Sequence, residues 1–451
     1  MVVVALVGLW AGVVAFVATN RPPLTELGAD AWSALSDPWS ANQPDVVTVP
    51  SPRPSAPTRP PAQPAQPTQP GRPAQPAQPA QPAPAPAAPV PVPSTPTPAG
   101  SEATLGQRFG GFSMPLEQVQ FLSNADIDRQ ADLLVELNGG WQRADYMWSR
   151  TEPSRGVFTW DDQDRWIQAA VARGIQPVPV LYFTPSWARP AGSSDKHVPT
   201  DLSDYGTWVG EACAHLWSIG VRHVELWNEQ NLSGFFQPLS SNADRDAYIT
   251  MAEDAATKCK AATPDMFVLA GGLSTSDTVF QRHGGSPNGA FNTMAYYADH
   301  GLYEYVDGQA WHPYLDDYEP GQDVDGWPRW APGAIAQALA ILDSGAPGRN
   351  LQLWNTESSA PRSAMSAEEQ AQRAQLAYES FLPGGFAYPY RARLGPFFWF
   401  SLRNRSINGG GGSSDRSRED SLGLVTADWS VRFPAFDAIQ ATLARPAAND
   451  P

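Results

Sequence analysis

Two stretches of the sequence each bring a glutamate to the end of an apolar run. Residues 224–231 contain the pair Asn228-Glu229, and residues 351–359 contain Glu357. Both stretches are typical of buried strands with polar residues at their C-terminal tips. Two carboxyl groups held in this way can flank a glycosidic bond, where one protonates the leaving oxygen and the other attacks the sugar carbon or activates water. A single strand-end Glu is usually solvated or salt-bridged, so the prediction rests on the pair.

The elements that must position these residues alternate along the chain from about residue 109 to residue 443. Eight strand-helix units are predicted, with strands at 109–114, 141–147, 175–183, 224–229, 266–271, 306–314, 351–357 and 396–401. Such alternation requires parallel strands joined by crossover helices, and eight units close into a (β/α)8, or TIM, barrel. The expected fold class is therefore α/β.

Polar and aromatic residues gather at the predicted strand tips, where the functional groups of this fold lie. They are Arg143, Asn228, Glu229, His312, Tyr314, Glu357 and Trp399. His312 could also be a structural histidine. Trp399 could fill the barrel mouth, but an indole face there also suits the apolar face of a pyranose ring.

Other chemistries find little support. The sequence contains no His-Glu-x-x-His zinc motif and no Gly-x-Ser-x-Gly elbow. Residues 323–326 match a fragment of a calcium loop whose other ligands are missing, so we expect neither a metal nor a cofactor. The two cysteines, Cys213 and Cys259, fall in predicted helices. They can pair in an oxidising compartment or remain buried thiols.

The first hundred residues differ in composition from the rest. Residues 1–18 carry no charged side chain and are long enough to span a bilayer, and the poor cleavage site at 16–18 favours an uncleaved signal anchor over 1–20. Residues 21–100 form the predicted linker, and its Pro/Ala/Gln-rich part, 41–100, cannot pack a core. We therefore expect a membrane-anchored protein whose domain at 101–451 lies outside the cytoplasm, with cleavage and secretion as the alternative.

Charge also limits the choice of partners. The net charge of -16 belongs to the region after residue 100, because the four Arg and four acidic residues before it cancel. No Lys/Arg cluster occurs, which argues against a nucleic-acid partner. We expect a monomer.

Residues from about 106 to 444 resemble the clan A glycoside hydrolases, the retaining (β/α)8-barrel enzymes, and are most similar to the family 39 and cellulase-like family 5 type. The resemblance rests on six segments: 227–229 (WNE), 354–357 (WNTE), 311–314 (WHPY), 152–160 (EPSRGVFTW), 422–425 (LGLV) and 433–436 (FPAF). One departure is Gln230, where the family often has Pro.

The resemblance implies a role for each matching residue. Glu229 would be the acid/base and Glu357 the nucleophile. Asn228 would bind the sugar 2-hydroxyl, Arg143 would keep the nucleophile ionised, and His312 or Tyr314 would contact it. The implied activity is hydrolysis of O-glycosidic bonds in an extracellular or envelope poly- or oligosaccharide. A transglycosylase and a non-catalytic carbohydrate-binding or wall-anchoring barrel remain alternatives.

Overall fold

The computed structural model describes residues 103–115, 122–275, 289–315, 318–323, 329–404 and 421–448. The predicted membrane anchor and linker lie outside these residues, so both stay predictions. Within the described part of the chain, no helix is both long and apolar enough to cross a membrane.

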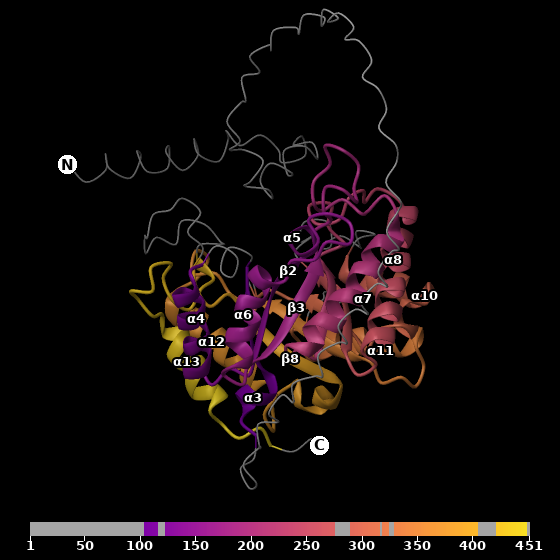
Figure 1. Cartoon of the computed structure of the whole chain (residues 1–451). Coiled ribbons are helices and arrows are strands. Elements are labelled where there is room, and N and C mark those ends of the chain that lie inside the picture. The colour runs from indigo at the N-terminus through magenta and orange to yellow at the C-terminus, as the bar shows by residue number, and fades with distance from the viewer. Residues whose placement is uncertain are drawn as a thin grey trace, which may run out of the picture. The chain divides into compact units, whose positions relative to one another are not determined.

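Eight parallel strands form a closed barrel in sequence order, with β1 hydrogen-bonded to both β2 and β8. Helices surround the strands (Figure 1). The strands are β1 (Gly110–Met114), β2 (Trp141–Met147), β3 (Gln176–Tyr182), β4 (His223–Asn228), β5 (Phe267–Ser274), β6 (Gly308–His312), β7 (Gln352–Ser358) and β8 (Leu394–Phe400). This architecture confirms the predicted (β/α)8 barrel.

Several of the described helices begin at side chains that cap them or at prolines, as α11 and α13 do. Ser123 caps α4, and Ser366 caps α12 through a capping box with Glu369. The helices are α3 (Leu105–Phe109), α4 (Asn124–Glu136), α5 (Trp148–Thr151), α6 (Asp161–Val171), α7 (Leu202–Ser218), α8 (Asn242–Ala262), α10 (Ala290–Asp299), α11 (Pro332–Gly345), α12 (Ala367–Glu379) and α13 (Pro434–Leu443), with the 3-10 turns η4 (Leu302–Glu304) and η5 (Tyr388–Arg393).

The inside of the barrel is packed at its N-terminal end by large side chains. Trp141, Val178, Leu269, Trp354 and Phe398 form this inner cluster. His223 lies among these rings, with its ring centroid 4.9 Å from that of Trp141. Burial, helped by the charge of Arg222, lowers the pKa of His223 to about 4. The inner cluster fills the barrel at the N-terminal ends of the strands. A site inside the barrel is therefore expected at the C-terminal ends of the strands.

The two cysteines form a disulfide that joins neighbouring helices. Cys213 of α7 and Cys259 of α8 are bonded, with their Cα atoms 5.4 Å apart. This confirms the pairing and removes the alternative of two buried thiols.

The calcium-loop fragment begins with a residue that serves a different purpose. Both carboxylate oxygens of Asp323 accept the backbone N–H of Gly333 at 2.9 Å, at the start of α11. A carboxylate at a helix N-terminus is a favourable cap. The other residues of the fragment, 324–326, lie outside the described residues.

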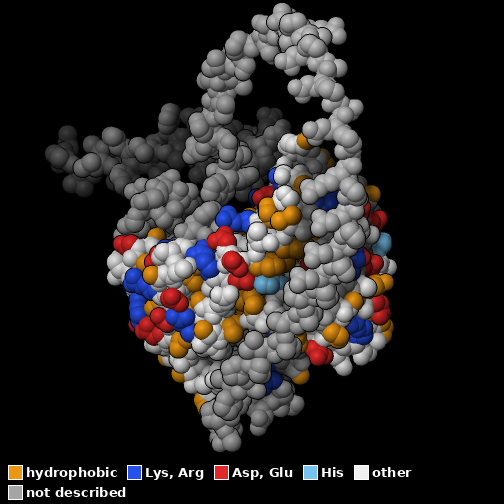
Figure 2. All heavy atoms as spheres, in the orientation of Figure 1, with side chains coloured by type: hydrophobic (Ala, Val, Ile, Leu, Met, Phe, Trp, Pro, Cys, Tyr) orange, Lys and Arg blue, Asp and Glu red, His pale blue; other side chains and the backbone are white. Residues whose placement is uncertain are grey.

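The described surface carries mixed charges. Figure 2 shows Lys/Arg and Asp/Glu side chains interspersed over the side of α4 and α6, where Arg173 pairs with Asp128 at 3.1 Å and Asp132 at 2.7 Å. The described part of this face therefore shows no large basic patch. That no nucleic acid binds remains a prediction.

Candidate active site

Polar side chains occupy the upper half of the barrel, above the inner cluster. Successive side chains of a strand point to opposite faces, so Arg143 faces inward like Trp141, two residues earlier on β2. Its neighbours there come from distant strands, Glu225 on β4 and Glu357 on β7. The barrel thus brings together residues that are far apart in sequence.

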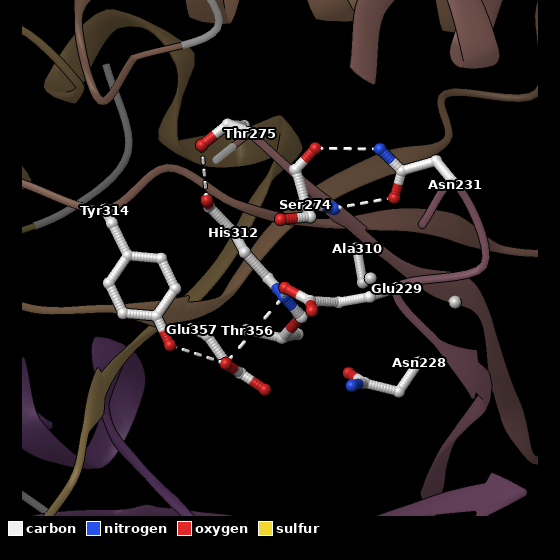
Figure 3. A network of polar contacts seen from close by, with 12 residues as sticks. Asn228, Glu229, Asn231, Ser274, Thr275, Ala310, His312, Tyr314, Thr356 and Glu357 are labelled. Atoms are coloured by element: carbon white, nitrogen blue, oxygen red, sulfur yellow. Dashed lines mark hydrogen bonds and ion pairs between the residues drawn. The ribbon is translucent and has the colours of Figure 1, made fainter. Parts of the chain in front are cut away.

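Glu357 is held by one donor at each carboxylate oxygen. Arg143 Nη1 donates to Oε1 at 2.7 Å. The Tyr314 hydroxyl donates to Oε2 at 2.7 Å (Figure 3). Burial acts to raise the pKa of Glu357, but positive charge at His312 and Arg143 and the two hydrogen bonds lower it below its ordinary value. A carboxylate kept ionised in this way is suited to act as a nucleophile.

Glu229 stands beside Glu357 on a strained turn. Trp227 and Glu229 have φ angles of 76° and 46°, values that residues other than glycine rarely adopt. His312 Nδ1 lies 3.0 Å from Glu229 Oε1, and its Nε2 lies 3.2 Å from the Thr356 hydroxyl. One atom each of Glu229, His312 and Glu357 lie within 4.8 Å of one another, so the two carboxyl groups are close neighbours.

Asn228 is oriented by the same arginine. Its Oδ1 accepts Arg143 Nη2 at 2.8 Å. Because an amide has one acceptor oxygen and one donor nitrogen, this bond fixes which end is which. The Nδ2 group is then the end that can donate to a ligand.

Glu225 is a site residue that the sequence analysis missed. It is completely buried and accepts Arg143 Nε at 2.7 Å and Nη2 at 2.8 Å. Although burial opposes the charge on Arg143, Glu225 and Glu357 together raise the pKa of Arg143 above its usual range. The signal in the sequence was the position of Glu225 between the apolar residues Val224 and Leu226. A charged residue buried in a strand needs a partner of opposite charge.

Gly272 of β5 links three parts of the site. Its N–H donates to Glu225 Oε1 at 2.8 Å, and its carbonyl accepts the N–H of Glu229 at 2.8 Å. A Cβ at this position would lie 2.1 Å from His312 Nε2. Only glycine allows β5 to approach the histidine this closely.

Amides beyond the β4 tip fasten the Glu229 turn to β5. Asn231 donates to the carbonyl of Ser274 at 2.8 Å and accepts the N–H of Ser274 at 2.9 Å (Figure 3). Gln230, at the position where the related families often have Pro, donates to the carbonyl of Gly271 at 3.0 Å. Side-chain amides therefore hold this turn.

The prediction that Trp399 contacts a ligand at the mouth is corrected by the structure. Trp399 is completely buried among the residues of the outer core, and its indole N–H donates to the carbonyl of Leu422 at 3.2 Å. The alternation on β8 instead turns Phe398 and Phe400 inward. The ring centroid of Phe400 lies 6.2 Å from that of Tyr314.

The triad of Glu229, His312 and Glu357 has ligand atoms that could surround a cation. However, both oxygens of Glu357 already accept strong hydrogen bonds, from Arg143 and Tyr314. A metal would have to displace these donors or share the oxygens with them. The arrangement fits an acid-base pair better than a metal centre.

Comparison with known proteins adds information on the fold. No family model matches the chain, and no curated protein matches it. A solved structure of a family 39 glycoside hydrolase from the gut symbiont Bacteroides cellulosilyticus WH2 is similar, with a TM-score of 0.57 and 20% identity, covering 76% of this chain and 65% of that one. This chain thus spans slightly less than two thirds of that enzyme.

Two further solved structures show the same likeness. GH5_18 from Streptomyces cattleya, in complex with GlcNAc, has a TM-score of 0.55 and 16% identity, covering 78% of this chain and 82% of that one. The exo-beta-1,4-mannosidase Op5Man5 from Opitutaceae bacterium strain TAV5 has a TM-score of 0.50 and 15% identity, covering 76% and 60%. The chain shares its fold with these glycoside hydrolases.

Proposed function

We propose that this protein is a retaining glycoside hydrolase that cleaves O-glycosidic bonds with Glu357 as nucleophile and Glu229 as acid/base. The observation that carries the proposal is the unequal environment of two adjacent carboxyl groups. Glu357 accepts hydrogen bonds from Arg143 and Tyr314, whereas Glu229 lies against His312. Adjacent carboxyl groups with different surroundings can divide the roles of base and acid.

The spacing supports a covalent intermediate. Retaining enzymes hold their carboxyl groups about 5–5.5 Å apart, and inverting enzymes about 6.5–9.5 Å apart to admit a water. Here the nearest ligand atoms of the two glutamates lie within 4.8 Å. In the first step Glu357 attacks the anomeric carbon while Glu229 protonates the departing oxygen. In the second step Glu229 takes a proton from water, which displaces Glu357 from the sugar.

The remaining polar groups act on the substrate or on the two glutamates. The Nδ2 of Asn228, fixed by its bond to Arg143, donates to the sugar 2-hydroxyl. Hydrogen bonds at that position strengthen in the transition state and contribute several kcal/mol. Tyr314 and Arg143 stabilise the carboxylate of Glu357 before it attacks.

The proposed location is outside the cytoplasm, on a membrane tether. The disulfide between Cys213 and Cys259 supports this location, because disulfides persist in oxidising compartments. The proposed substrate is a poly- or oligosaccharide within reach of that tether.

Mass spectrometry after incubation with 2-deoxy-2-fluoro glycosides tests the proposal. The panel contains the gluco, manno, xylo and galacto sugars. We expect a covalent adduct on a peptide containing Glu357, and none in Glu357→Gln. The control Glu304→Gln changes a Glu that lies in the turn η4 before β6, outside the site, and should label like the native chain. An adduct on another residue, or equal labelling of Glu357→Gln, would contradict the assignment.

A further inference from the structure

The hydroxyl of Thr356, the residue before Glu357 on β7, makes a contact that the proposed double displacement does not use. A bulge in β7 explains why this hydroxyl faces the site. From Asn355 to Ser358, β7 advances by three residues while β8 advances by two, from Phe397 to Trp399. A bulge of this kind interrupts the alternation of side chains and re-aims them. Thr356 and Glu357 therefore both reach side chains of the site, although they are neighbours in sequence.

His312 joins the Thr356 hydroxyl to Glu229. The Nε2 atom of His312 lies 3.2 Å from the hydroxyl, and its Nδ1 atom lies 3.0 Å from Glu229 Oε1 (Figure 3). Thr356 and His312 are both completely buried, and the Thr275 hydroxyl donates to the backbone carbonyl of His312 at 2.6 Å. The imidazole ring is thus fixed with each nitrogen in hydrogen-bond range of one partner.

The direction of the bond between Thr356 and His312 follows from the partners available to the hydroxyl. Within the described part of the chain, Nε2 is the sole hydrogen-bond partner of the Thr356 hydroxyl. If Nε2 carried a proton and donated it, the hydroxyl proton would be buried without an acceptor, which is unfavourable. If the hydroxyl donates to Nε2, both groups are satisfied, and the proton of the neutral ring then lies on Nδ1. A protonated ring also carries a proton on Nδ1, so Nδ1 is a donor in both charge states.

A proton on Nδ1 decides which oxygen of Glu229 acts as the acid. Because Nδ1 donates to Oε1, a protonated Glu229 must carry its own proton on Oε2. Among the described residues, Oε2 has no hydrogen-bond partner, so its proton remains available to a ligand. With the opposite tautomer of His312, the acidic proton could lie on Oε1 and point at Nδ1, where the departing oxygen cannot take it.

We propose that Thr356 is a positioning residue for the acid/base: its hydroxyl donates to His312 Nε2, keeps a proton on Nδ1 and so holds the acidic proton of Glu229 on Oε2. This inference rests on the proposed function. In the first step the O–H bond at Oε2 breaks as the departing oxygen takes the proton, and Nδ1–H stabilises the carboxylate that is left. In the second step Oε2 takes a proton from water.

The dependence of the rate on the leaving group tests the inference in the full-length protein. The substrates are aryl glycosides of the sugar that labels Glu357, from the acidic 2,4-dinitrophenol to the weakly acidic 4-methoxyphenol. The weakly acidic phenol needs a proton to depart, whereas 2,4-dinitrophenolate departs without one. General acid catalysis contributes about 10²–10⁴-fold, and Thr356→Val, which removes only the hydroxyl, should lose about tenfold of this in kcat/KM for the 4-methoxyphenyl glycoside. The 2,4-dinitrophenyl glycoside should react at nearly the native rate.

Two variants control for effects on packing. Thr356→Ser keeps a hydroxyl and should restore most of the rate with the 4-methoxyphenyl glycoside. Thr263→Val also removes a buried threonine hydroxyl, which donates to the carbonyl of Cys259 at 3.0 Å, and should keep the native dependence on the leaving group. Equal losses for all phenols in Thr356→Val, or the same change of dependence in Thr263→Val, would overturn the inference.

Nitrogen NMR of the full-length protein with isotopically labelled histidine reads the tautomer directly. The chain contains six His, and the signals of His312 are those that disappear in His312→Asn. We expect a protonated Nδ1 and an unprotonated Nε2 in the neutral ring, and a mixture of tautomers in Thr356→Val. A native ring with its proton on Nε2 alone would overturn the inference, even if Thr356→Val does not fold.

These outcomes are separable from a failure of the proposed function. If a fluoro sugar labels Glu357 but Thr356→Val leaves the dependence on the leaving group unchanged, only the inference about Thr356 fails. If the tautomer is as expected but Glu357 is never labelled, the hydrolase proposal fails and the assignment of the proton to Nδ1 stands.

Discussion

Removing the hydroxyl of Tyr314 should move the acid limb of the activity profile to higher pH. This hydroxyl donates to Glu357 Oε2 at 2.7 Å, and Arg143 serves the other oxygen. A hydrogen bond to a charged group contributes about 1.5–3 kcal/mol. Since one pKa unit corresponds to about 1.4 kcal/mol, Tyr314→Phe should raise the pKa of Glu357 by about 1–2 units.

The direction follows from the protonation state that the nucleophile needs. Glu357 must be ionised to attack, so a higher pKa makes kcat/KM fall at a higher pH on the acid side. The native pKa of Glu357 is lowered, so its ionisation stabilises the fold above the unfolded pKa of about 4.3, and this contribution disappears as the pH falls through the folded pKa. Tyr314→Phe should therefore destabilise the protein more at pH 7 than at pH 3.

The assay is kcat/KM from pH 3.5 to 8 with an aryl glycoside of the labelling sugar. Tyr205→Phe is the matched control, because it also deletes a tyrosine hydroxyl that donates a hydrogen bond, here to the carbonyl of Leu181 at 2.6 Å. The control should lose about 1 kcal/mol of stability and keep the native acid limb. An unmoved limb in Tyr314→Phe, or the same shift in both variants, would refute the reasoning.

Three further predictions concern other parts of the barrel. Changing both Cys213 and Cys259 to Ser removes a disulfide that joins residues 46 apart in sequence. In the chain-entropy model this should lower the free energy of unfolding by about 4 kcal/mol, while the fluoro sugar should still label Glu357. An unchanged melting temperature would contradict this prediction. Asn231→Leu removes both hydrogen bonds that the Asn231 side chain makes to Ser274. Because side chains that position catalytic groups have effects of this order, kcat should fall about tenfold with little change in KM. A change in KM alone would contradict this prediction. The pKa of His223 is lowered to about 4, so its contribution to stability should be lost as the pH falls from about 6.5 to 4, by at most about 3 kcal/mol. His223→Phe should flatten this pH dependence in urea unfolding, and an equally steep loss would count against it.

The alternation of apolar segments was enough to predict the barrel. The predicted second strand, 141–147, coincides with β2, and the others differ from the observed strands by a few residues at their ends. The strand tips then placed Arg143, Asn228, Glu229, Tyr314 and Glu357 correctly in one site, because parallel strands of a closed barrel end on the same side. The roles assigned to these residues stay proposals.

The direction in which the Trp399 side chain points could not be predicted from the pattern of polar and apolar residues. Residues 397–400 are all large and apolar, so no change of polarity marks which of them face inward. Strand side chains alternate with a period of two, so an uncertainty of one residue moves an aromatic ring from the mouth to the outer core. The structure places Trp399 in the outer core.

The hydrogen-bond partners of Glu229 and Arg143 could not be predicted from the sequence for another reason. Glu225, Gly272 and Asn231 act through contacts between β4 and β5, and the separation of 47 residues between Glu225 and Gly272 carries no local signal. The burial of Glu225 is explained by Arg143, which lies beside it in the folded barrel. Such long-range polar contacts follow from the closed barrel and not from propensities along the chain.

The anomeric form of the first product is the most direct test of the central claim that Glu229 and Glu357 act by double displacement. The sugar that labels Glu357 is supplied as its aryl glycoside, and proton NMR follows the product before it mutarotates. The account predicts that the first product has the anomeric configuration of the substrate. A first product of the opposite configuration would contradict it, because a single displacement by water inverts the anomeric centre.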